Sequence, residues 1–218
     1  RCDLTIEPET YRRMLEHSGE IAKCAQARVS EEFFRLLRSG AAKRSMELLL
    51  ETSLLGVMMP ELATALTAEV TSEDDRRRRA RFWGYMAALD QSTSRRDIPP
   101  SNALVLATLL FPPLRDALHP DTNSIRDIGQ MVEQSIKPIL ERLKASRRDG
   151  ELARQILLAM RYIFPSGNPN RKRPRLAGRE FLDDALRLHE IVSEADAKEP
   201  DLVGTPLLTD GEPPAPLT

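Results

Sequence analysis

The spacing of apolar residues most constrains what this chain can fold into. Leu, Ala, Ile and Met make up most of the apolar set, and they recur at helical intervals, as at Met46, Leu50 and Leu54. Aromatic residues are only 5% of the chain, and β-branched residues seldom show the alternation with polar residues that strands require. The sequence therefore predicts an all-α fold with no sheet.

Prolines, glycines and capping residues divide this pattern into segments. Ser30 is expected to cap a helix over residues 31–39, which Gly40 ends. Ser72 and Asp75 form a capping box for a long helix that reaches about residue 91. The other predicted helices cover residues 7–18, 41–55, 61–70, 101–110, 113–118, 124–144, 150–163 and 179–195.

A linker rich in charge and proline, at residues 95–100, predicts a junction between two helical parts. We expect a first helical region at 1–92, an arginine-rich helical region at 93–195, and an acidic tail at 196–218. Prolines, glycines and acids make the tail too polar to build a core, so we expect it to be disordered. The chain opens at Arg1 instead of Met, and we expect it to be part of a longer protein.

The net charge of −1 is an average over two oppositely charged parts. Residues 189–218 carry seven acidic side chains and one basic one, whereas residues 1–188 have a net charge of +5. Residues 140–180 alone hold eleven basic and four acidic side chains, a net charge of +7. This excess favours a polyanionic partner for that part of the chain.

The densest basic cluster lies at residues 171–179. Pro169 and Pro174 keep its first part out of the helix that follows, because proline lacks the N–H that a helix needs. The charges are then presented on an extended or turning segment, where they could meet phosphates; the alternative is a solvated basic loop. Its members are Arg171, Lys172, Arg173, Arg175 and Arg179.

A second basic cluster comprises Arg76, Arg77, Arg78, Arg79 and Arg81. Consecutive helical residues point about 100° apart, so these arginines cannot form one patch. Either two of them line a nucleic-acid track, or the helix is simply solvated with Phe82, Trp83 and Met86 turned to the core.

Tyr162 and Phe164 precede the first cluster, and aromatic side chains beside cations can stack on the bases of a single strand. Core packing is the alternative, and we favour it for Phe164.

Several classes of site are excluded by the residues present. The two cysteines, Cys2 and Cys24, cannot form a disulfide framework, so a reducing cytoplasmic setting is expected. His17, His119 and His189 stand alone, so no metal ligands are predicted. No nucleophile elbow or phosphate-binding glycine loop occurs, and no apolar run reaches the roughly 20 residues that span a bilayer. We expect no catalytic residues, no bound metal and no membrane contact in this chain.

Two N-terminal stretches carry a resemblance to a known superfamily. The opening, residues 1–10, resembles the point just past the catalytic head in the class II nucleotidyltransferases, which include bacterial poly(A) polymerases and tRNA CCA-adding enzymes. Residues 27–33 resemble the Glu-Arg-Ile-x-x-Glu-Leu motif of their neck, where Arg28 and Glu32 match and Ala27 replaces the first glutamate.

Later stretches resemble the poly(A) polymerase branch. Residues 99–110 with 113–115 are similar to the segment that follows its body, and residues 161–189 are similar to its arginine-rich C-terminal part. The His-Asp motif of phosphohydrolase domains found on some CCA-adding enzymes is absent. The resemblance extends over roughly residues 1–195.

The resemblance implies that the intact protein adds AMP from ATP to RNA 3′ ends, with Mg²⁺ held by carboxylates of an N-terminal catalytic domain. The Gly-Ser and Asp-x-Asp elements of that domain do not occur in these 218 residues, so this chain would hold single-stranded RNA and bind no cofactor. Both basic clusters would then contact phosphates, while Arg28 and Glu32 would stabilise the neck. The alternatives are a fragment of a CCA-adding enzyme, or a helical scaffold whose acidic tail binds an RNA-degradation or chaperone protein.

Overall fold

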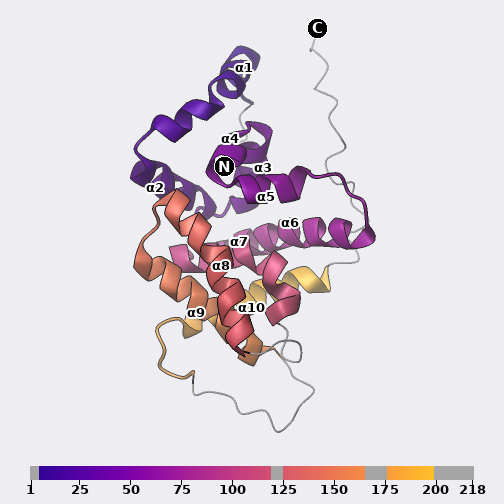
Figure 1. Ribbon diagram of the computed structural model, residues 1–218, viewed down its shortest axis with the longest axis vertical. Helices are drawn as coiled ribbons and strands as arrows, with labels where there is room; N and C mark the ends of the chain where they lie inside the picture. The colour runs from indigo at the N-terminus through magenta and orange to yellow at the C-terminus, as the bar shows by residue number, and fades with distance from the viewer. Residues whose placement is uncertain (1–4, 119–124, 165–175, 199–218) are drawn as a thin grey trace.

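The computed structural model describes residues 5–118, 125–164 and 176–198, and every regular element within them is a helix (Figure 1). This confirms the all-α prediction for the described residues. The N-terminal elements are α1 (Pro8–Glu16), the 3₁₀ helix η1 (Ser18–Lys23), α2 (Gln26–Leu37), α3 (Ala42–Glu51), α4 (Leu54–Met58) and α5 (Pro60–Thr67). The later elements are α6 (Glu73–Ser94), α7 (Asn102–Leu118), α8 (Ile125–Leu143), α9 (Arg147–Ile163) and α10 (Leu182–Ala197).

Helix α7 lies at the centre of the bundle. Every residue from Ala103 to Phe111 is buried, because α6, α8, α9 and α10 all pack against this helix. A helix that is apolar on all sides must be enclosed in this way. The buried residues form one cluster that runs from Phe33 to Ala195, through both predicted helical regions. The boundary at residue 92 stays a prediction.

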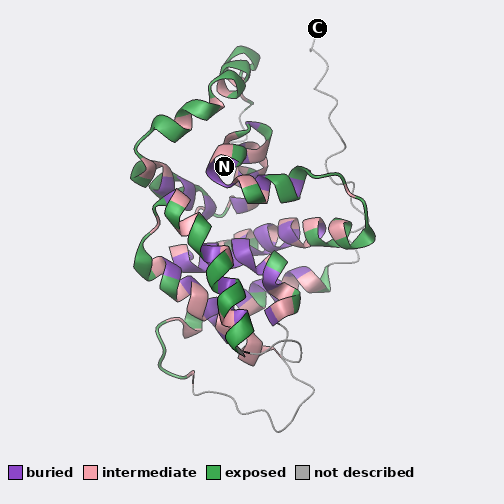
Figure 2. Ribbon diagram, viewed as in Figure 1, coloured by how far each residue is buried: buried purple, intermediate pink, exposed green. Residues whose placement is uncertain are grey.

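Helix α1 lies at the edge of the molecule. It has no buried residue, and Figure 2 shows its surface as exposed. The Tyr11 hydroxyl donates a hydrogen bond to the Glu51 carbonyl at 3.1 Å, and η1 packs against α4. Helices α1 and η1 therefore lie at the edge of the molecule, whereas α2 and α3 pack on the central bundle.

The predicted cap at Ser30 is wrong. Helix α2 starts at Gln26, and Ser30 is only 6% exposed on its inner side. Ser30 lies one turn before Phe33 and Phe34, so the small hydroxyl side chain belongs to the buried stripe of the helix. The side-chain amide of Gln26 instead donates to carbonyls of the preceding turn, at Ile21, Ala22 and Cys24.

Two other stretches are divided into helices differently from the prediction. The expected helix at 41–55 is interrupted at Ser53, whose φ of 60° is left-handed, and α4 begins directly after it. The two helices expected at 101–110 and 113–118 form a single α7, with Pro112 and Pro113 inside it. An interior proline costs a backbone hydrogen bond, but packing around α7 keeps the helix continuous.

The predicted start of α6 is confirmed. The Ser72 Oγ accepts a hydrogen bond from the Asp75 N–H at 3.1 Å and donates one to the Asp75 carboxylate at 2.7 Å. These contacts, with one from Thr71, lower the pKa of Asp75. Phe82 and Met86 are buried as expected, and Trp83 is partly buried against the core.

Asp90 on α6 caps a different helix, α3. Its two carboxylate oxygens accept hydrogen bonds from the N–H groups of Ala42 at 2.5 Å and Lys43 at 3.0 Å. The first amides of a helix have no acceptor of their own, so we expect Asp90→Ala to lower the free energy of unfolding by about 1–2 kcal/mol. Urea denaturation measures this. Asp90→Asn keeps one acceptor oxygen and should recover part of the loss, whereas equal stability of all three proteins would contradict the capping role.

Candidate nucleic-acid interface

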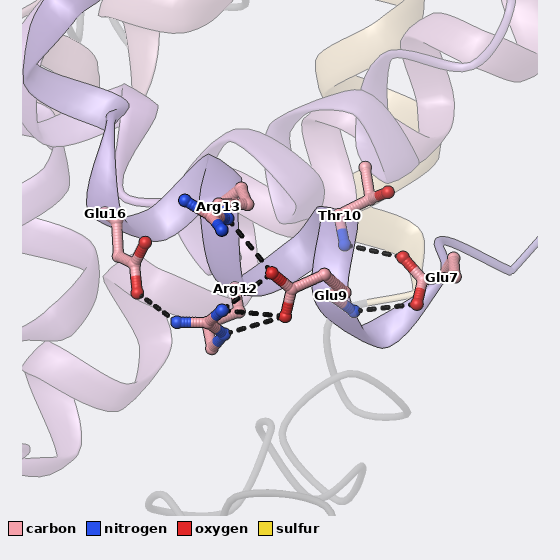
Figure 3. Close-up of polar contacts among 6 residues, drawn as sticks. All are labelled: Glu7, Glu9, Thr10, Arg12, Arg13 and Glu16. Atoms are coloured by element: carbon pink, nitrogen blue, oxygen red, sulfur yellow. Dashed lines mark hydrogen bonds and ion pairs between the residues drawn. The ribbon is translucent and has the colours of Figure 1, made fainter.

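The cations of α1 are bound by carboxylates of the same helix (Figure 3). Arg12 contacts Glu9 at 2.7 Å and Glu16 at 2.6 Å, and Arg13 contacts Glu9 at 3.0 Å. The Glu7 carboxylate caps the helix by accepting hydrogen bonds from the next amides, chiefly that of Thr10 at 2.7 Å, and these lower its pKa. The surface of α1 is consequently close to neutral.

Helix α2 carries the two residues that we expect to stabilise a neck. Arg28 and Glu32 are both exposed. Glu32 forms its ion pair with Arg35 and not with Arg28. Among the described residues, no ion pair or side-chain hydrogen bond is made by Arg28. The structural role of Arg28 and Glu32 stays a prediction, and the Arg28 guanidinium is open to an anion.

Arg38, at the end of α2, connects the N-terminal elements to the central bundle. Its Nε donates to the Pro100 carbonyl at 2.6 Å, and its Nη1 to the Asn102 side chain at 3.4 Å. The Asn102 amide in turn donates to Asp149 at 3.3 Å, at the start of α9. This chain of contacts places the end of α2 beside the start of α9.

The arginines of α6 point in different directions, as their spacing predicts. Arg76 and Arg77 both lie near Glu73, at 3.6 Å and 3.4 Å. The Arg79 guanidinium donates to the Ala68 carbonyl, and Arg78 is exposed. Arg81 is partly buried. The structure does not gather these side chains into one patch.

The first basic cluster is described only in part. Arg171, Lys172, Arg173 and Arg175 lie outside the described residues. Arg179 is exposed just after Gly178, whose φ of +77° forms a left-handed turn. Next to it, Glu180 forms an ion pair with Arg148 on α9. Arg179 therefore lies close to the first turn of α9.

Phe164 packs against the core, which is the role that we favour for it from the sequence. Its ring stacks on that of Phe111 with centroids 6.0 Å apart and lies 5.4 Å from that of His189. Phe164 is consequently occupied by protein contacts. Tyr162 is partly buried on the same helix end.

A groove of about 670 Å³ separates α5 from α7 and α8. Leu62, Leu110 and Ile139 are among the apolar residues that line it, and Arg78 of α6 lines it as well. A two-pronged ion pair at 2.5 and 2.8 Å joins Glu61 of α5 to Arg142 of α8 beside it. The hydrogen bonds from Arg142 lower the pKa of Glu61 to about 2, so the pair remains charged at neutral pH.

Neither a metal site nor a membrane span is found in the described residues. Within residues 5–118, 125–164 and 176–198, no three His, Cys, Asp or Glu side chains gather where they could hold an ion. None of the described helices is both long and apolar enough to cross a bilayer.

Comparison with known proteins identifies the N-terminal elements. Residues 3–66 match the family model described as "Probable RNA and SrmB-binding site of polymerase A". These residues are therefore similar to a poly(A) polymerase-related RNA-binding region. The match spans α1 to most of α5, which is under a third of the chain. No curated protein and no solved structure matched the chain.

The charge of the matched residues bears on how they could bind RNA. Residues 3–66 hold eight basic and ten acidic side chains, a net charge of −2. Electrostatic attraction supplies much of the affinity for nucleic acid, so RNA binding by the matched elements would need cations from elsewhere in the fold. The structure provides neighbours for this purpose, because α2 packs on α8 and α3 packs on α6.

Sequence reasoning missed several contacts that build this surface. The Glu61–Arg142 and Arg38–Asn102 contacts join residues 81 and 64 positions apart. Arg187 is only 6% exposed, although it lies in an otherwise charged stretch. No local pattern marks these residues, because their partners come from distant segments.

Proposed function

We propose that this chain holds the RNA substrate of a poly(A) polymerase-like enzyme, which adds AMP from ATP to RNA 3′ ends. The observation that carries the proposal is the match of residues 3–66 to the RNA-binding region of polymerase A. The all-helical arrangement and the basic excess at residues 140–180 agree with this role. ATP and Mg²⁺ would be bound by a catalytic domain, and this chain would position the RNA strand.

Within this proposal, phosphates are held by the two basic clusters. Arg171, Lys172, Arg173, Arg175 and Arg179 form the main contact. The exposed side chains of Arg76, Arg77 and Arg78 extend it, while Arg79 and Arg81 are less accessible. A single strand could then pass from the matched elements to the arginine-rich part.

The salt dependence of RNA binding tests the proposal. If about four to six phosphates are engaged, the logarithm of the affinity for poly(A) should fall with the logarithm of salt concentration at a slope of roughly −3 to −4. Fluorescence anisotropy with labelled oligo(A) at several salt concentrations measures this slope. Changing Arg171, Lys172 and Arg173 to Ala should make it shallower by about 2. A slope near zero for the unchanged chain would contradict RNA binding.

Competition between two kinds of RNA distinguishes the poly(A) polymerase proposal from the alternative of a CCA-adding enzyme. A poly(A) polymerase region should bind oligo(A) at least as well as tRNA in direct competition. A strong preference for tRNA would favour the CCA-adding fragment instead.

A protein partner is a second candidate function. The description of the matched family names a protein, SrmB, beside RNA. We propose that the chain also takes part in a protein contact, and the acidic tail at 196–218 is the candidate segment. Pull-down of partners with and without residues 196–218 tests it, and unchanged recovery would exclude the tail.

A further inference from the structure

We propose that the corner where α8 ends and α9 begins binds the phosphate backbone of the RNA strand, through Lys144 and Arg147. This inference rests on the proposed RNA-holding function. It assigns a contact outside the matched residues 3–66 and outside both basic clusters.

The corner carries cations that have no acidic partner among the described residues. Lys144, Arg147 and the neighbouring Arg179 are exposed, and within the described part of the chain none of them makes an ion pair or a side-chain hydrogen bond. Many other described cations are occupied, as Arg142 is by Glu61 and Arg154 by Glu151. An exposed cation without a protein partner can exchange its counterion for a phosphate.

The fold brings this corner next to the matched region. Lys144 lines a cleft of about 380 Å³ together with Gln26 and Val29 of α2, which belongs to the matched region. The ion pair between Arg148 and Glu180 brings Arg179 to the other side of the corner. Figure 1 shows α2 beside the end of α8 and the start of α9.

The acidic side chains nearby do not cancel this charge. Glu180 is neutralised by Arg148, whereas Asp149 keeps its charge because the Asn102 amide that donates to it is neutral. Glu141 lines the same cleft as Lys144 and is the acid that faces it. Lys144, Arg147 and Arg179 against the carboxylates of Glu141 and Asp149 leave the corner with an excess of positive charge.

The backbone conformation of Lys144 allows an effect of this residue on folding to be distinguished from an effect on binding. Its φ of +49° is left-handed, and the Ala145 N–H donates to the Leu140 carbonyl at 3.1 Å, which closes α8 as a Schellman motif. Glycine is the residue that this position favours, since a side chain there costs about 1–2 kcal/mol. A lysine at this position is therefore unfavourable for the fold, whereas its charge is available to a ligand.

The test uses the full chain and a labelled 20-nucleotide oligo(A), with anisotropy measured from low to moderate salt. For Lys144→Gly/Arg147→Gln, the salt slope should become shallower by about 1.4, because each single-strand phosphate contact contributes about 0.7. Affinity at low salt should fall about five- to tenfold, while the melting temperature stays equal or rises. Lys144→Arg/Arg147→Lys keeps both charges and should retain binding.

The matched control is Arg126→Gln/Lys137→Gln, which removes two exposed cations from earlier turns of α8. It should bind nearly as well as the unchanged chain. Equal losses in both double variants would show an effect of net charge and overturn the assignment, as would normal binding by Lys144→Gly/Arg147→Gln. Absence of binding by the unchanged chain would instead refute the proposed function itself.

Discussion

Replacing Phe111 with alanine should lower the free energy of unfolding by about 3–5 kcal/mol. The Phe111 side chain is completely buried on α7, with ring centroids 5.8 Å from Tyr85 and 6.0 Å from Phe164. These two rings come from α6 and from the end of α9, so the substitution opens a cavity where three elements meet. Proteins are typically stable by only about 5–15 kcal/mol, so the variant should lose a large share of its stability.

Two further variants test whether the loss of stability comes from core packing. Phe111→Leu leaves a smaller cavity and should cost about 1–2 kcal/mol. Ile98→Ala removes a side chain that is 76% exposed, and its effect should stay within about 0.5 kcal/mol. Urea denaturation gives all three values. If Phe111→Ala were no worse than Ile98→Ala, this part of the core would be wrongly placed.

Replacing Arg187 with alanine should cost about 2–4 kcal/mol. The Arg187 Nε donates to the Ser92 hydroxyl at 2.9 Å, and its Nη1 donates to the Ile98 carbonyl at 3.2 Å. Alanine would leave the buried Ser92 without this partner and would open space between α6 and α10. The hydrogen-exchange protection of residues 95–98 should fall as well, because Arg187 holds the linker that follows α6.

A methionine at position 187 separates packing from hydrogen bonding. Burial lowers the pKa of Arg187, and the nearby Arg96 lowers it further, so keeping this charge inside the protein is unfavourable. Arg187→Met fills much of the space without a charge and should therefore cost less than Arg187→Ala. Arg187→Lys retains the charge but not the fork of donors. If Met were as damaging as Ala, the hydrogen bonds of the guanidinium would dominate over its volume.

The helical class and most element positions could be predicted from the sequence, because they depend on local signals. Helical spacing of apolar residues and the box at Ser72 and Asp75 act within one or two turns. The failures occurred where packing overrode a local preference. Ser30 has the side chain of a cap but lies in the buried stripe of α2, and Pro112 has the chemistry of a helix breaker but lies inside α7.

The candidate RNA-binding surface was predictable only in part. The sequence pointed to arginine-rich clusters, because charge density is visible without a fold. It gave no reason to select Lys144 or Arg147, which stand in an ordinary helix junction. Whether Lys144 and Arg147 are available to a phosphate depends on which cations the neighbouring carboxylates already pair with. This is known only once the structure shows ion pairs such as Arg142–Glu61.

The sequence by itself determined that this chain is helical, that it carries a basic part and an acidic tail, and that its N-terminal stretch resembles a region that binds RNA. These properties follow from composition and short-range spacing. Only the tertiary structure decided that Asp90 caps α3, that Arg187 is buried beneath the linker, and that α2 lies beside the corner of α8 and α9. The physical reason is that hydrogen bonds and charge pairs between distant segments form where apolar packing places them, and periodicity along the chain carries no record of that placement.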